Sequence, residues 1–391
     1  MKIFRALPAF VTVLVVPAWA VYAPIPEQEQ GKEFTGSVNV GLSHDSNIFG
    51  AQSATISSSV LTVSPSLKFN SSLTDQTFFS ANYALTIDHF ENRPGDKTLD
   101  SHDLGVRLAH SFSPTTSMDV SDEYTISKNP ASLLAGVPLN TDQSYKRNQF
   151  DGRLQTSAGE KNSLTVKVRS VAYNYDNAAL GTDLDRTENL FGLELGRDLV
   201  PELQINGEYR RQVVNYRSAG GNKDKQSNFL IGGFNYAVAK KLTATGRAGY
   251  EWRERDGAPD TGAPYAEFSA KTDYAERSYL TAGYVHTFEE ASNVVQFTDT
   301  EVNRFFVNVQ HSMSALVVAS ASFNYEPSTL QGRGAQVDID ERTTRFGLAL
   351  TYLPTQHLSV AATFDADHVK SDDVTRGMKR QRYGINATYS F

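Results

Sequence analysis

The sequence predicts an all-β protein, a transmembrane antiparallel β-barrel of about 18 strands, with roughly 16 as the alternative. Three observations support this fold class. The last nine residues alternate apolar with small or polar side chains and end on an aromatic residue. The first twenty residues follow the pattern of a secretory signal peptide. Between these two ends, short turns alternate with longer polar links, as expected for periplasmic turns and extracellular loops.

The C-terminal segment has the pattern of a closing barrel strand. Successive side chains of a strand point to opposite faces, so Gly384, Asn386, Thr388 and Ser390 are expected to face the lumen. The lipid-facing set is then Tyr383, Ile385, Ala387, Tyr389 and Phe391. We interpret Tyr389 and Phe391 as the assembly signal that the barrel assembly machinery would recognise.

The N-terminal segment indicates export. Lys2 and Arg5 precede an apolar run at 9–16, and small residues offer cleavage after Ala20 or Ala23. The expected location is therefore the outer membrane of a Gram-negative bacterium, with the signal peptide removed. The predicted organisation is a signal peptide at 1–23, a short polar periplasmic tail at 24–33 and an outer-membrane β-barrel at 34–391.

Composition fits a barrel and argues against other classes. The 391 residues include no cysteine and 40% hydrophobic residues, with a mean hydropathy of −0.39. No run beyond the N-terminus is long enough for a transmembrane helix, but barrel strands are only weakly hydrophobic because every second residue meets lipid. Loss of Lys2 and Arg5 with the signal peptide leaves 35 basic against 44 acidic residues. Nucleic acid is therefore not an expected partner.

The links differ in length in the order a barrel requires. Turns such as 71–75 and 200–202 are short, whereas links such as 129–145 and 328–339 are long and polar. The longest link, 129–145, is predicted to fold inward as a constriction, or alternatively to pack on the rim or against a neighbouring subunit. Its apolar residues are Leu133, Leu134, Val137 and Leu139.

Charged residues on the strands fall on the inward register. A basic side chain facing lipid at the membrane midplane would cost about 2–4 kcal/mol, which supports this orientation. They either line an aqueous pore or form cross-strand ion pairs worth roughly 0.2–1 kcal/mol each. The pore-lining candidates are Arg107, Arg153, Lys167, Arg169, Glu194, Glu208, Arg210, Arg247, Glu251, Glu267, Lys271, Arg304, Arg345, Asp365, Arg380 and Arg382. Most aromatic residues fall on the lipid-facing register, so no row of aromatic platforms is expected inside the lumen.

An enzyme is not predicted, and neither a catalytic residue, a cofactor nor a metal site is expected. Histidines adjoin carboxylates at His44-Asp45 and His102-Asp103, but sequence neighbours on a strand face opposite ways. No serine lies in a Gly-x-Ser-x-Gly turn. Asp45 with Asn47, or Asp372 with Asp373, supplies oxygen ligands that a divalent cation could use, although acidic loops are more often simply solvated.

One segment carries a family resemblance. The stretch Gly41-Leu-Ser-His-Asp-Ser-Asn-Ile-Phe49, together with the signal peptide and the terminal Tyr-x-Phe, resembles the β-barrel porin type 2 family. That family includes outer-membrane proteins of exopolysaccharide operons. The resemblance implies a passive outer-membrane channel for a secreted polysaccharide.

The predicted function is an outer-membrane channel that passes hydrophilic solute, with exopolysaccharide export as the leading expectation. Export would need separate periplasmic and inner-membrane partners, since no further domain is predicted. The alternatives are a general small-solute porin and a plugged barrel acting as scaffold or surface receptor. The expected partners are outer-membrane lipid and lipopolysaccharide, the barrel assembly machinery, periplasmic polysaccharide-export proteins, and a polysaccharide or small hydrophilic solute.

Overall fold

The computed structural model describes residues 33–128, 143–218, 223–291, 293 and 295–391. The predicted signal peptide, and all of the predicted tail except Glu33, lie outside this part of the chain. The described residues contain eighteen strands and two short helices. Their bounds are β1 Phe34–Asp45, β2 Ser58–Thr74, β3 Thr77–Phe90, β4 Thr98–Ser113, β5 Thr116–Ser127, β6 Tyr145–Ala158, β7 Asn162–Tyr175, α1 Ala178–Leu184, β8 Arg186–Val200, β9 Leu203–Tyr216, β10 Lys225–Ala239, β11 Leu242–Arg255, β12 Thr261–Ala275, β13 Ser278–Glu290, β14 Phe297–Ser312, β15 Val317–Gly332, β16 Ile339–Tyr352, β17 Leu358–Ser371, η1 Val374–Arg376 and β18 Met378–Ser390.

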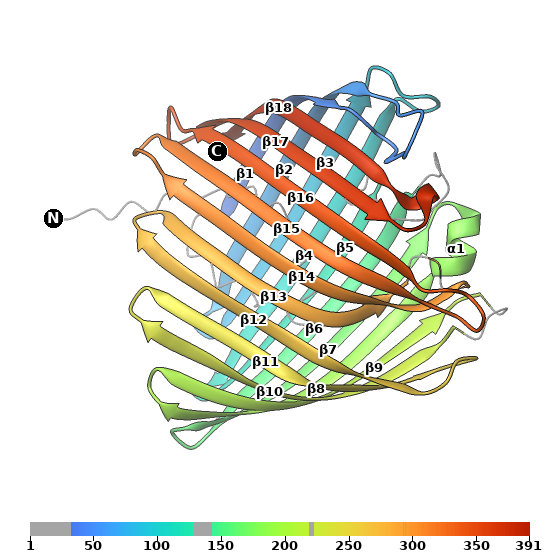
Figure 1. Ribbon diagram of the computed structural model, residues 1–391. Coiled ribbons are helices and arrows are strands. Elements are labelled where there is room, and N and C mark those ends of the chain that lie inside the picture. The colour runs from blue at the N-terminus through green and yellow to red at the C-terminus, as the bar shows by residue number, and fades with distance from the viewer. Residues whose placement is uncertain (1–32, 129–142, 219–222, 292, 294) are drawn as a thin grey trace.

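The eighteen strands form one closed antiparallel barrel (Figure 1). Each strand pairs with its neighbours in sequence, and β1 closes the ring by pairing with both β2 and β18. Closure leaves no sheet edge, so every strand has hydrogen-bonding partners on both sides. The predicted fold class and the strand number of about 18 are confirmed.

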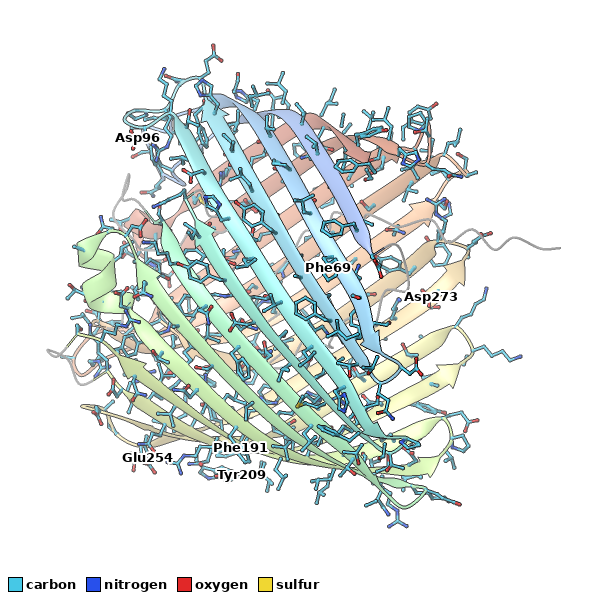
Figure 2. The ribbon with its side chains drawn as sticks, turned by 180° about the vertical axis from the view of Figure 1, so that it is seen from behind. Phe69, Asp96, Phe191, Tyr209, Glu254 and Asp273 are labelled. Atoms are coloured by element: carbon cyan, nitrogen blue, oxygen red, sulfur yellow. The ribbon has the colours of Figure 1, made fainter. Side chains whose placement is uncertain are left out.

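The barrel has an apolar outside. Side chains such as Leu42, Leu230 and Ile385 are at least 60% exposed, and Figure 2 shows Phe191 and Tyr209 on the outer surface of the strands. Only a closed barrel or a helix can cross lipid with its backbone groups satisfied. An outward apolar surface on a closed barrel therefore identifies a transmembrane β-barrel. No helix in the described part of the chain is long and apolar enough to cross a membrane.

The links confirm the alternation of lengths. At one end the connections have two to five residues, and at the other they have five to seventeen. The short-turn end, which is periplasmic in outer-membrane barrels, also holds the C-terminus (Figure 1). The long-link end, called the mouth below, holds α1 and η1. The predicted link 328–339 is shorter than expected, because β15 and β16 continue to Gly332 and from Ile339.

Candidate functional site in the lumen

The sixteen predicted pore-lining residues all lie on strands. Their positions alternate with the exposed apolar side chains, for example Arg210 beside Tyr209 and Arg382 beside Tyr383. The structure thus places them on the inner wall. Their contact with a solute stays a prediction.

A central cluster of these residues lies on β7, β8 and β9. Lys167 Nζ is 2.7 Å from Glu194 Oε2 and 3.2 Å from Glu208 Oε2. Arg210 Nε donates to Glu208 Oε1 at 3.0 Å, and the Arg210 side chain is fully buried. Arg247 approaches the same cluster, with its Nη2 atom 3.9 Å from Glu194 Oε2. Each buried carboxylate is therefore shared between two cations, which offsets the cost of removing these charges from water.

A second group, which we call the mouth cluster, consists of Lys225, Arg253, Arg255, Glu290 and Asp299. Lys225 Nζ is 2.5 Å from Glu290 Oε1, and Arg255 Nη2 is 2.9 Å from the same oxygen. Asp299 lies 3.1 Å from Arg255 Nη2 and 3.3 Å from Arg253 Nη1. Each of the five side chains is less than 10% exposed. Three cations and two carboxylates thus form one buried network near the mouth.

Sequence reasoning missed most of the mouth cluster. Lys225, Arg255 and Glu290 are the first or last residues of their strands, where alternation gives the least certain orientation. A usable signal was present, since Arg255 continues the inward series of Glu251 and Arg253 along β11.

Several other predicted residues form ion pairs across or along strands. Arg107 pairs with Asp119, Arg169 Nε lies 2.5 Å from Asp151 Oδ1, and Arg382 Nη2 lies 3.2 Å from Asp367 Oδ2. The ion-pair interpretation therefore describes the geometry of these arginines. Three more candidates also form ion pairs: Arg304 bridges Glu289 and Glu326, Glu251 lies 3.9 Å from Arg253, and Lys271 lies 3.5 Å from Asp273 near the short-turn end.

Four candidates make no ion pair within the described part of the chain. Arg153 donates a hydrogen bond to Gln155, and Glu267 accepts one from Tyr265. The other two are Arg345 and Asp365.

The inner wall also carries aromatic side chains, contrary to the expectation from sequence. Tyr145, Tyr173 and Tyr175 form a group with ring centroids 6.0–6.4 Å apart. The Arg186 guanidinium lies over the Tyr173 ring at 4.5 Å. Phe229 and Tyr265 similarly flank Arg210. Most aromatics do face lipid, but these lie on the inward register near the mouth, where Tyr173, Phe229 and Tyr265 are buried.

Part of the mouth is apolar. Val214, Phe297 and Leu330 are each at most 2% exposed and pack with Tyr216 and Ala291. A helical turn also contributes to the mouth, since Leu180 and Leu184 of α1 are buried and Asn177 caps its first turn. The predicted constriction residues Leu133, Leu134, Val137 and Leu139 lie outside the described residues.

The motif behind the family resemblance closes the barrel. The Asp45 carboxylate accepts from Arg380 Nε and Nη2 at 2.6–3.1 Å, although Arg380 was predicted to line the pore. Asn47 is fully buried, and its amide donates to the carbonyls of Ala51 and Lys379. The Asp-x-Asn pattern thus joins the end of β1 to the start of β18.

The terminal aromatics secure the opposite end of the same seam. Gly36 and Phe391 exchange two backbone hydrogen bonds of 3.1 and 2.9 Å. A Cβ atom at Gly36 would lie 2.5 Å from the Phe391 ring, so a larger residue there would require the ring to move. Tyr389 packs near His357, with ring centroids 6.1 Å apart. The role of Tyr389 and Phe391 as an assembly signal stays a prediction.

The acidic residues considered as cation ligands have other partners. Asp45 is held by Arg380, and Asp373 accepts from the Thr375 backbone N–H at 2.8 Å and its hydroxyl at 2.7 Å. The Thr375 N–H lowers the pKa of Asp373. Within the described ranges, no group of three or more His, Asp or Glu side chains could hold a metal ion.

Comparison with known proteins adds little to this geometry. No family model matches the chain, and no curated protein matches it. Among solved structures, OccAB4 from Acinetobacter baumannii is 10% identical, covering 93% of this chain and 99% of its own, with a TM-score of 0.49. The siderophore receptor PirA from Pseudomonas aeruginosa is 11% identical, with coverage of 93% and 81% and a TM-score of 0.46. The copper transporter OprC is 11% identical, with coverage of 92% and 68% and a TM-score of 0.46. Likeness at this level says nothing about the solute.

Proposed function

We propose that this protein is an outer-membrane channel for hydrophilic solute, and that the solute is a saccharide polymer leaving the cell. The observation that carries the proposal is the inner wall, which is polar and charged on strands all around a closed eighteen-stranded barrel. Barrels of about 16–18 strands are wide enough to leave an aqueous channel. An apolar ligand would find few matching surfaces on such a wall.

The balance of charge favours an uncharged, hydroxyl-rich solute. In the central cluster Lys167, Arg210 and Arg247 face Glu194 and Glu208, so all but one of the fixed charges cancel. Sugar hydroxyl groups both donate and accept hydrogen bonds, and can therefore use the ammonium and carboxylate groups alike. A strongly charged solute would instead meet both attraction and repulsion along the path.

The tyrosine group supports a saccharide further. Tyr145 and Tyr175 are half-buried and present aromatic rings on the inner wall near the mouth, where they pack with the buried Tyr173. Aromatic faces are flat, apolar surfaces with a polar hydroxyl at one end, and this combination suits the C–H faces of sugar rings. The proposed membership in the β-barrel porin type 2 family agrees with export of an exopolysaccharide through periplasmic and inner-membrane partners.

A plugged barrel is the second candidate. The buried apolar group of Val214, Phe297 and Leu330 lies at the mouth, where an open channel would expose it to water. If that end is sealed, the protein would serve as a scaffold or a surface receptor. Conductance separates this candidate from both a polysaccharide channel and a general porin.

The test is single-channel conductance of the refolded protein in a planar bilayer, with maltooligosaccharides of graded length as probes. Polysaccharide export predicts stable open steps that oligosaccharides block, with block strengthening as the chain lengthens. Tyr145→Ala with Tyr175→Ala, which removes the two half-buried rings of the group, should weaken that block without lowering the open conductance. Tyr209→Ala, which removes an outward-facing tyrosine, is the matched control.

Two outcomes would overturn the proposal. Open steps insensitive to every oligosaccharide would favour a general small-solute porin. The absence of conductance above background, for protein shown to be folded by its heat-modifiable migration in gels, would favour the plugged barrel.

A further inference from the structure

A basic group lies on the outer surface of three neighbouring strands near the mouth. This rim cluster comprises Arg342 of β16, His368 and Lys370 of β17, and Lys379 of β18. All four alternate with inward residues and so point away from the lumen, and Arg342, Lys370 and Lys379 are exposed. The strands that carry them run side by side toward η1 in Figure 1.

The rim cluster places like charges against each other. Arg342 lies directly opposite Lys370 across β16 and β17, so two permanent cations face each other. Lys379 lies directly opposite His368 across β17 and β18, and this second pair repels only when the imidazole is protonated. Directly opposed like charges destabilise a sheet. In the described part of the chain, the side chains of Arg342, Lys370 and Lys379 make no hydrogen bond and no ion pair. These three cations therefore have no paired carboxylate in the described part of the chain.

A hollow accompanies these charges. It has a volume of about 650 Å³ and is lined by the four rim residues together with part of the β1–β2 link, including Gln52 and Thr55. Two carboxylates, Asp340 and Asp372, also line it. Both follow the cations along their strands in the direction of the extracellular solution. The cations thus lie on the membrane side of the hollow.

The height of the rim cluster matches a membrane interface. The nearest outward aromatics below it are Phe346, Phe364 and Tyr383, which belong to the apolar outer surface. Arg342, His368 and Lys379 follow four residues further toward the mouth on the same face. At about 3.3 Å per residue on tilted strands, this is a rise of roughly 10 Å above the last aromatic. Charged lipid headgroups occupy that level.

We propose that the rim cluster binds the phosphate-bearing headgroup of an outer-leaflet glycolipid, the lipid A portion of lipopolysaccharide. The phosphate oxygens would accept from Arg342, Lys370 and Lys379 and relieve the opposed charges, because hydrogen bonds between ions of opposite charge are strong. The sugar portion would lie in the hollow, and the acyl chains would extend along Phe346 and Tyr383. This inference depends on the outer-membrane location but not on the solute that the barrel passes.

The test compares lipid binding by three forms of the full-length protein in a neutral detergent. The probe is purified lipid A carrying two phosphates, and binding is counted by native mass spectrometry. The variant R342Q/K370Q/K379Q removes the three cations. The matched control R211Q/K240Q/K241Q removes three exposed cations elsewhere, one on the outer face of β9 and two from the β10–β11 turn.

We expect the rim variant to bind about tenfold or more weakly than the wild type, given the attraction that each basic residue near a lipid surface supplies. The control should bind as the wild type does, and lipid A without phosphate should bind the wild type as weakly as the rim variant binds the phosphorylated form. Heat-modifiable gel migration verifies that each variant is folded.

Equal binding by the wild type and the folded rim variant would overturn the proposal. So would equal binding of lipid A with and without phosphate. Full competition by inorganic phosphate at the concentration of the lipid would assign the site to a free phosphate compound instead. The two proposals can fail independently. If the protein conducts normally but does not bind lipid A, only the proposed lipid site is wrong, and the proposed channel function stands.

Discussion

The inner and outer faces of the last strands place charge in opposite ways. On the inner face, Asp367 of β17 lies directly opposite Arg380 of β18. On the outer face, Arg342 of β16 lies directly opposite Lys370 of β17. Residues only a few positions apart along β17 thus have a partner of opposite charge on one side of the wall and of like charge on the other.

The difference indicates which partner each face has. Inner-wall charges near the mouth are buried, so a charge there needs a partner from the protein itself to offset its desolvation. Rim charges lie at the membrane surface, where water, ions or lipid can neutralise them. Each buried charge therefore depends on its partner within the protein, whereas opposed cations indicate an external ligand.

The largest expected effect comes from Asp45→Ala on the inner face. This change leaves Arg380, which is 4% exposed, without its carboxylate. Breaking a buried pair by removing one partner costs about 3–5 kcal/mol. The free energy of unfolding, measured by urea titration of the refolded barrel in detergent, should fall by this amount.

A double variant shows whether the uncompensated charge is the cause. Asp45→Ala combined with Arg380→Leu removes both charges and should recover much of the lost stability, because replacing a buried pair by apolar residues is often neutral. If Asp45→Ala alone costs less than about 1 kcal/mol, the Asp45–Arg380 pair behaves like an exposed one. The contrast between the faces would then be wrong.

A smaller effect of opposite sign is expected on the outer face. Lys370→Glu turns the opposed cations Arg342 and Lys370 into an oppositely charged pair. Such pairs contribute about 0.2–1 kcal/mol relative to neutral ones, and removal of the repulsion adds to this. The free energy of unfolding in detergent without lipopolysaccharide should therefore rise. Lys241→Glu, in the β10–β11 turn, serves as the control.

Addition of lipid A should reverse the order of stability. Bound ligand stabilises the folded form only when the site is intact, so the wild type should gain from lipid A and Lys370→Glu should not. A fall in stability for Lys370→Glu without lipid would show that the cations are not strained against each other.

The sequence predicts which face of the barrel a charged side chain lies on, but not which charges lie opposite each other. Alternation with a period of two assigns a side chain to the inner or outer face, and it placed Arg210 and Arg380 on the inner wall correctly. It does not give the register between strands, and register decides which charges meet. The pairing of Asp45 with Arg380 joins positions 335 apart, and no local pattern could have indicated it.

The mouth was harder to predict for a different reason. Membrane-spanning segments must alternate because lipid covers one face, but beyond the membrane this requirement ends. The strands β15 and β16 extend past the predicted boundaries into the link 328–339. Arg255 and Glu290 were missed at such strand ends.

The smallest effect is expected for an ion pair in the mouth links, which lies on neither the inner wall nor the outer surface of the barrel. Asp176, in the β7–β8 link, accepts a hydrogen bond from Lys128 and lies 3.6 Å from Lys146 Nζ. The Lys128 hydrogen bond, with the attraction of both ammonium groups, lowers the pKa of Asp176. A carboxylate with a lowered folded-state pKa stabilises the protein above its unfolded value of about 3.9. That stability is lost as the pH falls through the folded value.

Asp176→Asn should therefore reduce the free energy of unfolding at neutral pH and leave it unchanged at low pH. Because both side chains are 25–32% exposed, water and salt screen the pair, and the loss should be about 0.5 kcal/mol or less. Urea titrations at several pH values between about 7 and 2 measure it, with Asp260→Asn in the β11–β12 link as the control. A loss as large as that of Asp45→Ala would mean that the mouth links exclude water as the inner wall does. Charges in these links would then need a partner within the protein, although they lie further from the membrane than the rim cluster.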